Sequence, residues 1–333
     1  MILSIESSCD DSAIAITEIE SCKVLFHARI SQEEDHAQYG GVVPELAARI
    51  HAVNLPDILE KAADFLPDVK AVAVTNGPGL VVSLLEGVMM AKALALALNV
   101  PLIPVNHIKG HIYSIFIEEA KTDFPMSVLM ISGGHTQVIE AEGYDRMRVV
   151  GSSMDDSAGE SFDKVAKMMG LGYPGGPVIE SLAKGGDAKR FSLPKPLRQS
   201  RDVAFSYSGL KNAVRLHIEA LGDGMGEAER RDLAASFQYS AFEHIFDKLK
   251  RYFDTIRPTT LAVVGGVSAN GYFRQGLDRL CTAYGVKTRY AQLAYCSDNA
   301  AMIGRAAVDA YHLKAFAAMD DLDVYSRSDL EKR

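Results

Sequence analysis

The stretches SIESSCDDSAIAI (residues 4–16) and SVLMISGGHTQVIEA (residues 127–141) follow the same order of features. In each, an apolar run ends in a turn of small and polar residues, and a segment of alternating apolar residues follows. These patterns predict two strands joined by a tight turn. A third strand is predicted after each pair, over residues 23–30 and 147–150. The repeated order predicts an α/β fold of two like-built lobes, each with a mixed sheet flanked by helices.

Helical patterns fill much of the remaining chain. The predicted helices cover residues 44–65, 80–98, 209–220, 227–256, 271–283 and 299–313. Pro56 is expected to break or restart the first of them, and Ser297-Asp298 to cap the last. The longest helix carries a predicted core stripe of Leu233, Phe237, Ala241, Ile245, Leu249, Tyr252 and Ile256. Ser157 is expected to begin a further helix, and residues 171–177 are expected to form a loop.

Length and composition indicate a globular protein of about two domains. The chain has 333 residues, of which 48% are hydrophobic and 23% charged. The most apolar run, from Gly79 to Val100, approaches membrane-spanning length, but Glu86 and Lys92 interrupt it. We therefore expect a buried or partner-facing helix and no membrane. No signal-peptide pattern and no CxxC pair occur, which favours reduced thiols and a cytoplasmic location.

Charge is unevenly distributed along the chain. The net charge of −8 argues against general attraction to nucleic acid. Residues 184–201 nevertheless contain six basic residues and one acid, and Lys211 and Arg215 follow shortly after. Two interpretations stay open for this basic stretch. It is either a patch that holds a polyanion or a solvated loop whose charges mean little.

The heptapeptide VNHIKGH (residues 105–111) contains two of the nine histidines. In a helix, His107 and His111 would lie one turn apart on one face, where their neutral nitrogens can share a metal ion. Two histidines on a helix surface are the alternative interpretation. A metalloprotease helix reads HExxH and uses its glutamate as the general base, whereas Ile108 follows His107 here. Peptide hydrolysis is therefore poorly supported.

Three strand-to-turn junctions are built from small residues, at positions 7–12, 132–135 and 265–270. Glycine lets a ligand approach the backbone, and exposed N–H groups suit phosphate oxygens. None of the three fits a P-loop or a dinucleotide-binding motif, and each alone is typical of an ordinary turn. Together, with two of them placed symmetrically by the repeat, they favour a nucleotide in a cleft between the lobes.

Ten motifs, in order along nearly the whole chain, resemble those of one enzyme family. They are SIESSCDDSAIAI (4–16), YGGVVPELAAR (39–49), NGPGL (76–80), VNHIKGH (105–111), ISGGHTQ (131–137), DDSAGESFDKVAK (155–167), YPGGP (173–177), FSYSGLKNAV (205–214), GGVSAN (265–270) and CSDNAAMIG (296–304). With the duplicated lobes, they make the chain similar to the actin/hexokinase/heat-shock ATPase superfamily. Within it, the chain resembles the tRNA N6-adenosine threonylcarbamoyltransferases, once labelled O-sialoglycoprotein endopeptidases. The resemblance implies a lobe I at residues 1–121 plus 299–333 and a lobe II at residues 122–298.

The resemblance also implies which residues do the chemistry. His107, His111 and Asp298 match the family's ligands for one divalent metal ion, which is usually Fe²⁺ and sometimes Zn²⁺. Asp10 and Asp11 match the acidic pair of the first loop and are candidates for the catalytic proton acceptor. The family usually has glutamate in place of Asp11, so the shorter acid of this chain reaches less far. The positions implied to line the nucleotide and the acyl group are Met130, Ile131, Ser132, Gly133, Gly134, Asp163, Gly176, Glu180 and Asn270.

The implied reaction is acyl transfer. The threonylcarbamoyl group moves from threonylcarbamoyl-AMP to N6 of the adenosine at position 37 of tRNAs that read ANN codons, in a loop where bases leave the stack. AMP is released. The basic residues 184–215 are a candidate for part of the tRNA contact.

The resemblance implies protein partners as well. Bacterial members work with an inactive paralogue and a P-loop ATPase, and a separate enzyme makes the adenylate. Helices 44–65 and 80–98 are a candidate interface for the paralogue. Two other functional classes stay open. One is an ATP-dependent small-molecule kinase of the same superfamily, which would not need the two-histidine site. The other is a non-catalytic scaffold, which would lack the metal-binding set.

Overall fold

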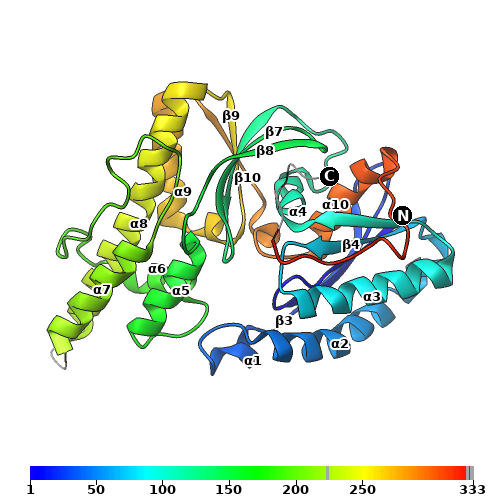
Figure 1. The fold of residues 1–333 in the computed structure, drawn as a ribbon, viewed down its shortest axis with the longest axis horizontal. Helices are drawn as coiled ribbons and strands as arrows, with labels where there is room; N and C mark the ends of the chain where they lie inside the picture. Colours follow the sequence, from blue (N-terminus) through cyan, green and yellow to red (C-terminus); the bar gives the residue numbers. More distant parts are fainter. Residues whose placement is uncertain (223–224, 328–329, 331–333) are drawn as a thin grey trace. The chain divides into compact units, whose positions relative to one another are not determined.

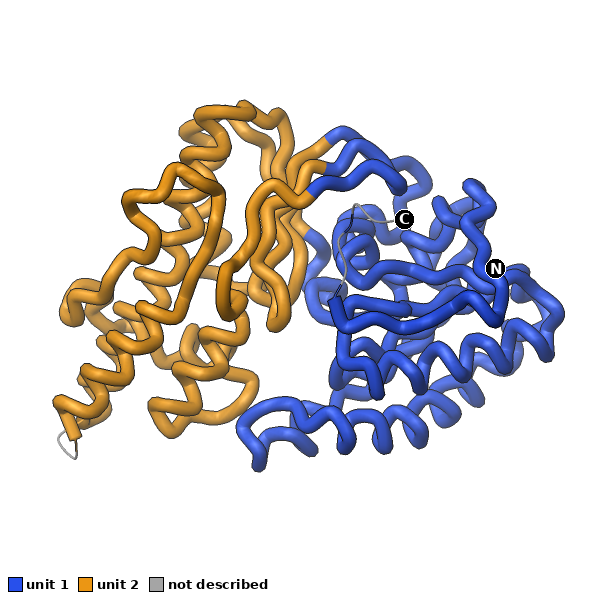
Figure 2. The backbone as a smooth tube through the Cα atoms, in the orientation of Figure 1, with its two compact units in different colours: residues 1–125, 141–148, 291–333 blue, residues 126–140, 149–290 orange. Residues whose placement is uncertain are grey.

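The computed structural model describes residues 1–222, 225–327 and 330, and the chain forms two compact units (Figure 2). Unit 1 comprises Met1–Pro125, Ala141–Arg148 and Ala291–Arg333, and unit 2 comprises Met126–Glu140 and Val149–Tyr290. Asp298 belongs to unit 1, whereas the boundary expected from the sequence assigned it to lobe II. The third predicted metal ligand therefore lies in the same unit as the two histidines.

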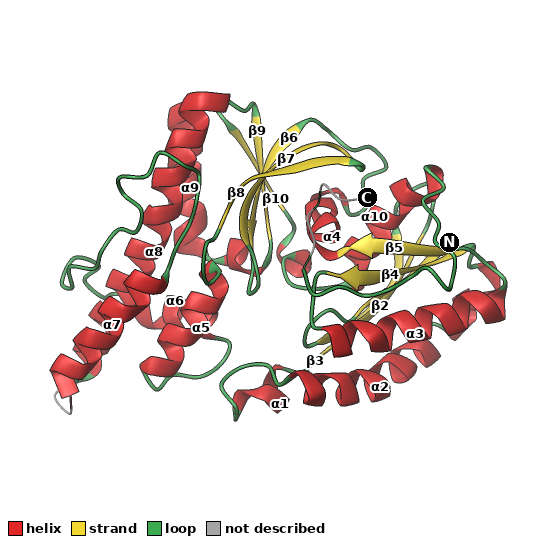
Figure 3. Ribbon diagram, in the orientation of Figure 1, coloured by secondary structure: helices red, strands yellow, loops and turns green. Residues whose placement is uncertain are grey.

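Unit 1 contains a five-stranded sheet with the strand order β3-β2-β1-β4-β5 (Figures 1 and 3). Its strands are β1 (Ile2–Glu6), β2 (Asp11–Thr17), β3 (Val24–Ser31), β4 (Ala71–Gly77) and β5 (Leu102–Asn106). Its helices are α1 (Glu33–Ala37), α2 (Pro44–Lys61), α3 (Val81–Leu98), α4 (His107–Tyr113) and α10 (Ala300–His312), with 3-10 turns η1 (Ala63–Asp68), η2 (Ser114–Phe116) and η5 (Leu293–Tyr295). The strands β1, β4 and β5 run parallel, so their carboxyl ends meet at one edge of the sheet, where ligands commonly bind.

The alternation of side chains along β1 gives this sheet two different faces. Leu3 and Ile5 belong to an apolar core that they form with buried residues of α2 and α3. Ser4 points the other way, and its hydroxyl donates to the carbonyl of Ala300 in α10, 2.8 Å away. Glu6 lies two residues beyond Ser4, so it shares the face that α10 covers. The strand thus carries a carboxylate under the helix that begins beside Asp298.

Unit 2 contains a second five-stranded sheet, in the order β10-β9-β6-β7-β8. Its strands are β6 (Met126–Ile131), β7 (Thr136–Gly143), β8 (Arg146–Ser152), β9 (Thr260–Val264) and β10 (Lys287–Tyr290), of which the β7–β8 tip clusters with unit 1. Its helices are α5 (Ala158–Met168), α6 (Gly175–Ala183), α7 (Ser208–Leu221), α8 (Glu227–Ile256) and α9 (Gly271–Tyr284), with a 3-10 turn η4 (Gly266–Ala269). The strands β6 and β9 are parallel and end together.

The predicted duplication is confirmed by the strand orders. In both sheets the first strand of the repeat is central, its second and third strands follow on one side, and two later parallel strands lie on the other. The predicted core stripe of α8 is buried from Leu233 to Tyr252. Ile256 is wrong as a member of it, because the helix end leaves that side chain 47% exposed.

Two sequence-based expectations fail where proline is concerned. Pro56 does not break the first long helix, because α2 is continuous from Pro44 to Lys61. Pro56 lies on the exposed side, where the carbonyl that loses its donor can meet water, while Leu55 and Ile58 are buried in the core. The stretch YPGGP is not only a loop, since Pro174 caps α6 and the helix begins at Gly175. Proline is compatible with the first turn of a helix.

Among the described residues, α3 is the one helix long and apolar enough to cross a membrane by length and composition. A third of it is buried in unit 1, on the face that carries Leu84, Val88 and Ala91. Core helices of globular proteins pass the same test. The opposite face exposes Leu85, Met89 and Leu96, so the helix is only partly buried and its contact with a partner stays a prediction.

Candidate functional site

The helix α4 starts directly at the carboxyl end of β5. The side chain of Asn106 accepts the N–H groups of Ile108 (2.9 Å) and Lys109 (3.2 Å), which caps the helix and makes His107 its first residue. Gly110 lets α4 approach α10, because a Cβ there would lie 2.6 Å from Ile303 Cδ1. Both histidines are buried as a result, and they lie one turn apart as predicted.

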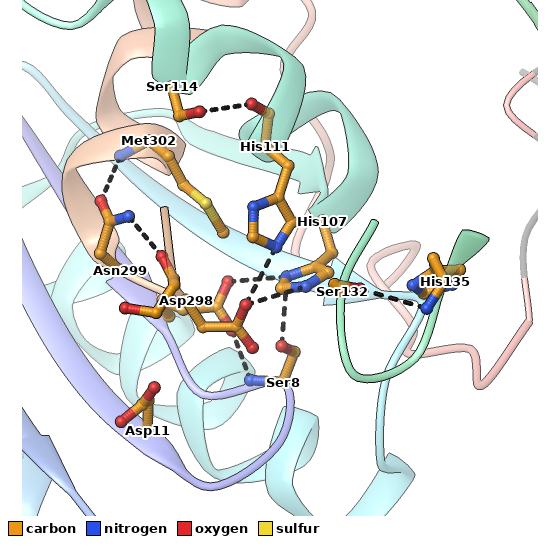
Figure 4. Close-up of polar contacts among 12 residues, drawn as sticks. Ser8, Asp11, His107, His111, Ser114, Ser132, His135, Asp298, Asn299 and Met302 are labelled. Atoms are coloured by element: carbon orange, nitrogen blue, oxygen red, sulfur yellow. Dashed lines mark hydrogen bonds and ion pairs between the residues drawn. The ribbon is translucent and has the colours of Figure 1, made fainter. Parts of the chain in front are cut away.

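The two imidazoles converge on one carboxylate (Figure 4). The Nε2 atom of His111 lies 2.9 Å from Asp298 Oδ1, and the Nε2 atom of His107 lies 3.5 Å from the same oxygen. Asp298 is not the cap of α10, contrary to the sequence-based expectation. That role belongs to Asn299, whose side chain accepts the N–H of Met302 at 2.9 Å. The shift of one residue leaves the Asp298 carboxylate to the histidines.

This cluster has the donor set of a metal site. One ligand atom from each of His107, His111 and Asp298 can be chosen so that all lie within 4.8 Å of one another. Two imidazole nitrogens and a carboxylate oxygen suit iron or zinc. The Nδ1 atom of His111 is buried without a hydrogen-bond partner among the described residues, which leaves the Nε2 side of the ring as its polar contact. The residues therefore fit the divalent ion that the resemblance implies.

A proton on His107 partly offsets the charge of the two carboxylates in the cluster. Burial lowers the pKa of His107, but the carboxylates of Asp298 and Glu6 outweigh it and raise that pKa to about 9. Burial lowers the pKa of His111, and the hydrogen bond to Asp298 offsets this only in part. One imidazolium thus faces two carboxylates. Because metal ligands must be deprotonated, a cation that binds here displaces the proton of His107 and takes over its charge.

Glu6 is a candidate functional residue that the sequence reasoning missed. It is fully buried at the end of β1, and its Oε2 lies 3.2 Å from His107 Nδ1. The same carboxylate accepts the Ser8 N–H at 2.6 Å and the Thr75 hydroxyl at 2.5 Å. A carboxylate on Nδ1 fixes the ring so that Nε2 faces Asp298. The available signal was a single acid closing an otherwise uncharged strand.

The acidic pair Asp10 and Asp11 lies in unit 1 with the metal-site residues. Arg29 Nη1 lies 3.4 Å from Asp11 Oδ2 and donates to Ser297 Oγ, so it links Asp11 to the residue next to Asp298. Burial raises the pKa of Asp11 to about 8 although Arg29 opposes it, and burial also raises the pKa of Asp10. Asp11 is therefore a carboxyl group that holds a proton near neutral pH.

In unit 2, the loop 132–135 ends β6 and is held by its own backbone. The N–H of Ser132 donates to the carbonyl of His135 (2.8 Å), and the Ser157 hydroxyl donates to the carbonyl of Gly133. Around Gly133 and Gly134 nothing lies within 4 Å of where a Cβ would stand, so this backbone is open to a ligand. Met130 and Ile131 are fully buried, so they can offer only backbone atoms.

The remaining predicted nucleotide residues either lie at helix N-termini of unit 2 or accept hydrogen bonds from them. Asp163 Oδ1 accepts the N–H of Gly175 at 2.7 Å, and Glu180 Oε1 accepts the N–H of Gly271 at 2.9 Å. Asn270 caps α9 through the N–H of Phe273. These contacts tie α5, α6 and α9 together, while Gly176 has open space around its Cα. The nucleotide role of these residues, and of loop 132–135, stays a prediction.

Comparison with known proteins identifies a single family. The family described as tRNA N6-adenosine threonylcarbamoyltransferase matches residues 23–305. Proteins of that name from Wolinella succinogenes and Sulfurimonas denitrificans are 59% and 58% identical over 328 residues, which is 98% of this chain and 99% of each relative. The protein of the same name from Helicobacter pylori is 50% identical over 335 residues, covering 98% of both chains.

Solved structures of distant proteins share the fold. Full-length HypF, in a phosphate- and nucleotide-bound form, aligns with a TM-score of 0.61 at 14% identity, over 95% of this chain and 47% of its own. The activator of 2-hydroxyisocaproyl-CoA dehydratase from Clostridium difficile, with bound ADPNP, aligns with a TM-score of 0.53 at 14% identity, over 94% of both chains. These likenesses confirm the predicted actin-like two-lobe fold class.

The contact between Glu6 and His107 generates the first testable prediction. Glu6→Gln keeps the side-chain size but removes the charge that orients and polarises the ring, so the dissociation constant for Zn²⁺ or Fe²⁺ should rise about 10- to 100-fold. Competition with a chromophoric chelator measures it. Glu34→Gln, an exposed position in α1, makes the same charge change and should leave affinity unaltered. Equal affinity in the Glu6 variant and the wild type would contradict the assignment.

Proposed function

The chain belongs to the tRNA N6-adenosine threonylcarbamoyltransferases, and from this premise we propose that its threonylcarbamoyl donor is threonylcarbamoyl-AMP and that the reaction depends on the His107, His111 and Asp298 cluster. The acceptor is N6 of the adenosine next to the anticodon in tRNA. The observation that carries the proposal is the buried convergence of two imidazoles on one carboxylate at the carboxyl edge of a sheet. The relatives are named threonylcarbamoyltransferases, which supports this function over the kinase alternative.

The chemistry makes four demands on the protein. N6 of adenosine attacks the carbamoyl carbon, a C–N bond forms, the C–O bond to phosphate breaks, and AMP leaves with its electron pair. The exocyclic amine is a weak nucleophile because its lone pair is delocalised into the ring. The site must therefore align the two reactants, polarise the carbonyl and stabilise the leaving phosphate, and it must accept the N6 proton.

The candidate metal ligands would serve to polarise the carbonyl. A bound Fe²⁺, or Zn²⁺ as the alternative, would supply Lewis acidity or a ligand position for the threonyl group. His107, His111 and Asp298 would hold it. Glu6 keeps His107 in the tautomer that presents Nε2, and the buried surroundings of both rings exclude water from them.

The glycine-rich loop of unit 2 would stabilise the leaving phosphate. Its open backbone at Gly133 and Gly134 can donate N–H groups to the phosphate and carbonyl oxygens of the adenylate. We assign the AMP part of the donor to this region.

One acid of the pair would accept the N6 proton. Asp11 is the better placed candidate for the acceptor, because Arg29 connects it to Ser297, the residue that precedes Asp298. Asp10 is the alternative. The ionised carboxylate would take the N6 proton as the new bond forms.

Partners follow from the family and from one surface of unit 1. A groove of about 520 Å³ lies between α2, η1 and α3, and its lining includes Leu59, Leu66 and Met90. Val53 (62% exposed), Met89 (60%) and Leu96 (70%) extend the apolar surface on these helices. Exposed apolar patches of this kind mark protein contacts. We propose that the inactive paralogue docks here, that a P-loop ATPase and an adenylate-forming enzyme complete the system, and that the protein works in the cytoplasm.

Removing both histidines tests the function. His107→Ala with His111→Ala should eliminate bound iron and zinc and lower formation of the modified nucleoside more than about a hundredfold, because Lewis-acid stabilisation contributes several kcal/mol. The assay supplies unmodified tRNA, threonine, bicarbonate, ATP and the companion proteins, with metal measured by mass spectrometry. His312→Ala, an exposed histidine, is the control. Full turnover in the double variant, or a wild type that forms no modified nucleoside, would overturn the proposal.

Replacing each acid of the first loop tests the proton acceptor. Asp11→Asn should lower kcat about 10²- to 10⁴-fold while metal content stays unchanged. Because the acceptor must first lose its own proton, the wild-type rate should rise with pH and reach half of its plateau value at or below about pH 8. Metal loading should move this rise to lower pH, since it removes the repulsion from Asp298. Loss of turnover in Asp10→Asn alone would move the role to Asp10. If neither variant loses turnover, neither acid is the proton acceptor.

A charge placed on the apolar surface tests the docking site. Met89→Glu should weaken binding of the paralogue by about thirtyfold or more, as expected for a central contact of an interface. Calorimetric titration of the two purified proteins measures the dissociation constant. Leu313→Glu alters an apolar side chain that is 55% exposed elsewhere in unit 1 and serves as the control. Equal affinities for both variants would place the paralogue on another surface.

A further inference from the structure

A buried lysine in unit 2 has no part in the chemistry described above. Lys248 projects from α8 and is 1% exposed. Its Nζ donates to the backbone carbonyls of Leu197 (3.0 Å), Ser200 (3.1 Å) and Asp202 (3.1 Å). An ammonium group has three N–H donors, and here each has its own acceptor. Burying a charge is costly unless every donor is satisfied, so this arrangement depends on one loop conformation.

All three carbonyls belong to residues 197–202, which we call the Lys248 loop. Leu197 has a φ of +49°, a conformation that costs free energy for any residue with a side chain. Arg251, one turn after Lys248 on α8, donates to the carbonyl of Arg198 at 2.6 Å. The loop is therefore fastened to α8 at four carbonyls, although it is exposed and has no regular secondary structure. Strained backbone held this firmly is typical of functional loops.

Half of the eight cations between Lys184 and Arg215 are already neutralised. Arg190 pairs with Glu229 and Asp232, and three others also pair with acids: Lys195 with Glu243, Lys211 with Asp156 and Arg215 with Glu219. Lys184, Lys189, Arg198 and Arg201 are exposed and make no ion pair within the part of the chain that the structure describes. Two of these four cations lie on the Lys248 loop. Its acid, Asp202, accepts the Ser200 hydroxyl at 3.2 Å.

The geometry points to a phosphate-binding loop for the tRNA substrate: we propose that Arg198 and Arg201 contact the RNA backbone and that Lys248 is the positioning residue that holds them. The inference rests on the proposed function, because it takes tRNA as the polyanion. One guanidinium group can donate to two oxygens of the same phosphate. A loop that is ordered before binding also loses less entropy when the contact forms. The net charge of −8 makes a local cationic loop the kind of surface that RNA needs on this protein.

Salt dependence separates a phosphate contact from a general structural effect. Each phosphate contact adds about 0.7 to 0.9 to the slope of log affinity against log salt concentration. Arg198→Gln with Arg201→Gln should therefore raise the KM for tRNA and reduce that slope by about 1.4 to 1.8, while kcat changes less than about twofold. The measurement uses the full-length, metal-loaded protein with its companion proteins, at several KCl concentrations.

The control matches the charge change. Arg231→Gln removes an exposed guanidinium of unit 2 that is paired with Glu227, and the slope should stay at the wild-type value. Lys248→Met keeps the aliphatic stem but releases the three carbonyls, so it should raise the KM for tRNA and flatten the slope as the double variant does. If circular dichroism shows that the Met variant does not fold, the arginine variants decide the question alone.

The outcomes distinguish this proposal from the function on which it rests. A wild type that forms no modified nucleoside overturns the proposed function. An active wild type whose KM and salt slope are unchanged in the double variant overturns only the loop assignment. An unchanged KM at saturating companion protein, with weakened binding of that protein, would also overturn it, because the loop would then contact an acidic protein surface.

Discussion

The structure of unit 1 depends on a carboxylate buried under an imidazole. Glu6 ends β1 on the face opposite the apolar core, so it cannot reach that core or water. Its charge is tolerated because Ser8, Thr75 and His107 supply donors from three separate segments. The first loop, β4 and α4 must therefore meet at one point. The position of the candidate metal site follows from that requirement.

The two units use one strand order for opposite electrostatic purposes. At the carboxyl edge of the first sheet, Glu6 and the nearby Asp298 carboxylate surround two imidazoles and favour a cation. At the corresponding edge of the second sheet, the backbone at Gly133 and Gly134 is open and would favour an anion. The local residues, and not the topology, decide what each edge binds.

The sequence was sufficient for the duplication and for most helices, because hydrophobic periodicity reports which face of each element is buried. The metal ligands were identified through resemblance, since no local pattern joins Asp298 to a helix 187 positions earlier. A single acid at the end of a strand gives no signal of its burial, so Glu6 was missed. The cap of α10 was displaced by one residue because Asp298 and Asn299 are both good caps, and only the packing of α4 against α10 distinguishes them.

The late position of α10 has a consequence for synthesis. Ser4 finds its acceptor in Ala300, and His111 finds its carboxylate in Asp298, so both partners leave the ribosome long after β1 and α4. Until then the growing chain carries Glu6 and the two histidines without the helix that covers them in the folded protein. A nascent chain can therefore form its first sheet early, yet it cannot close the candidate metal pocket until Asp298 has been synthesised. Premature termination before Asp298 would release a product without the third ligand.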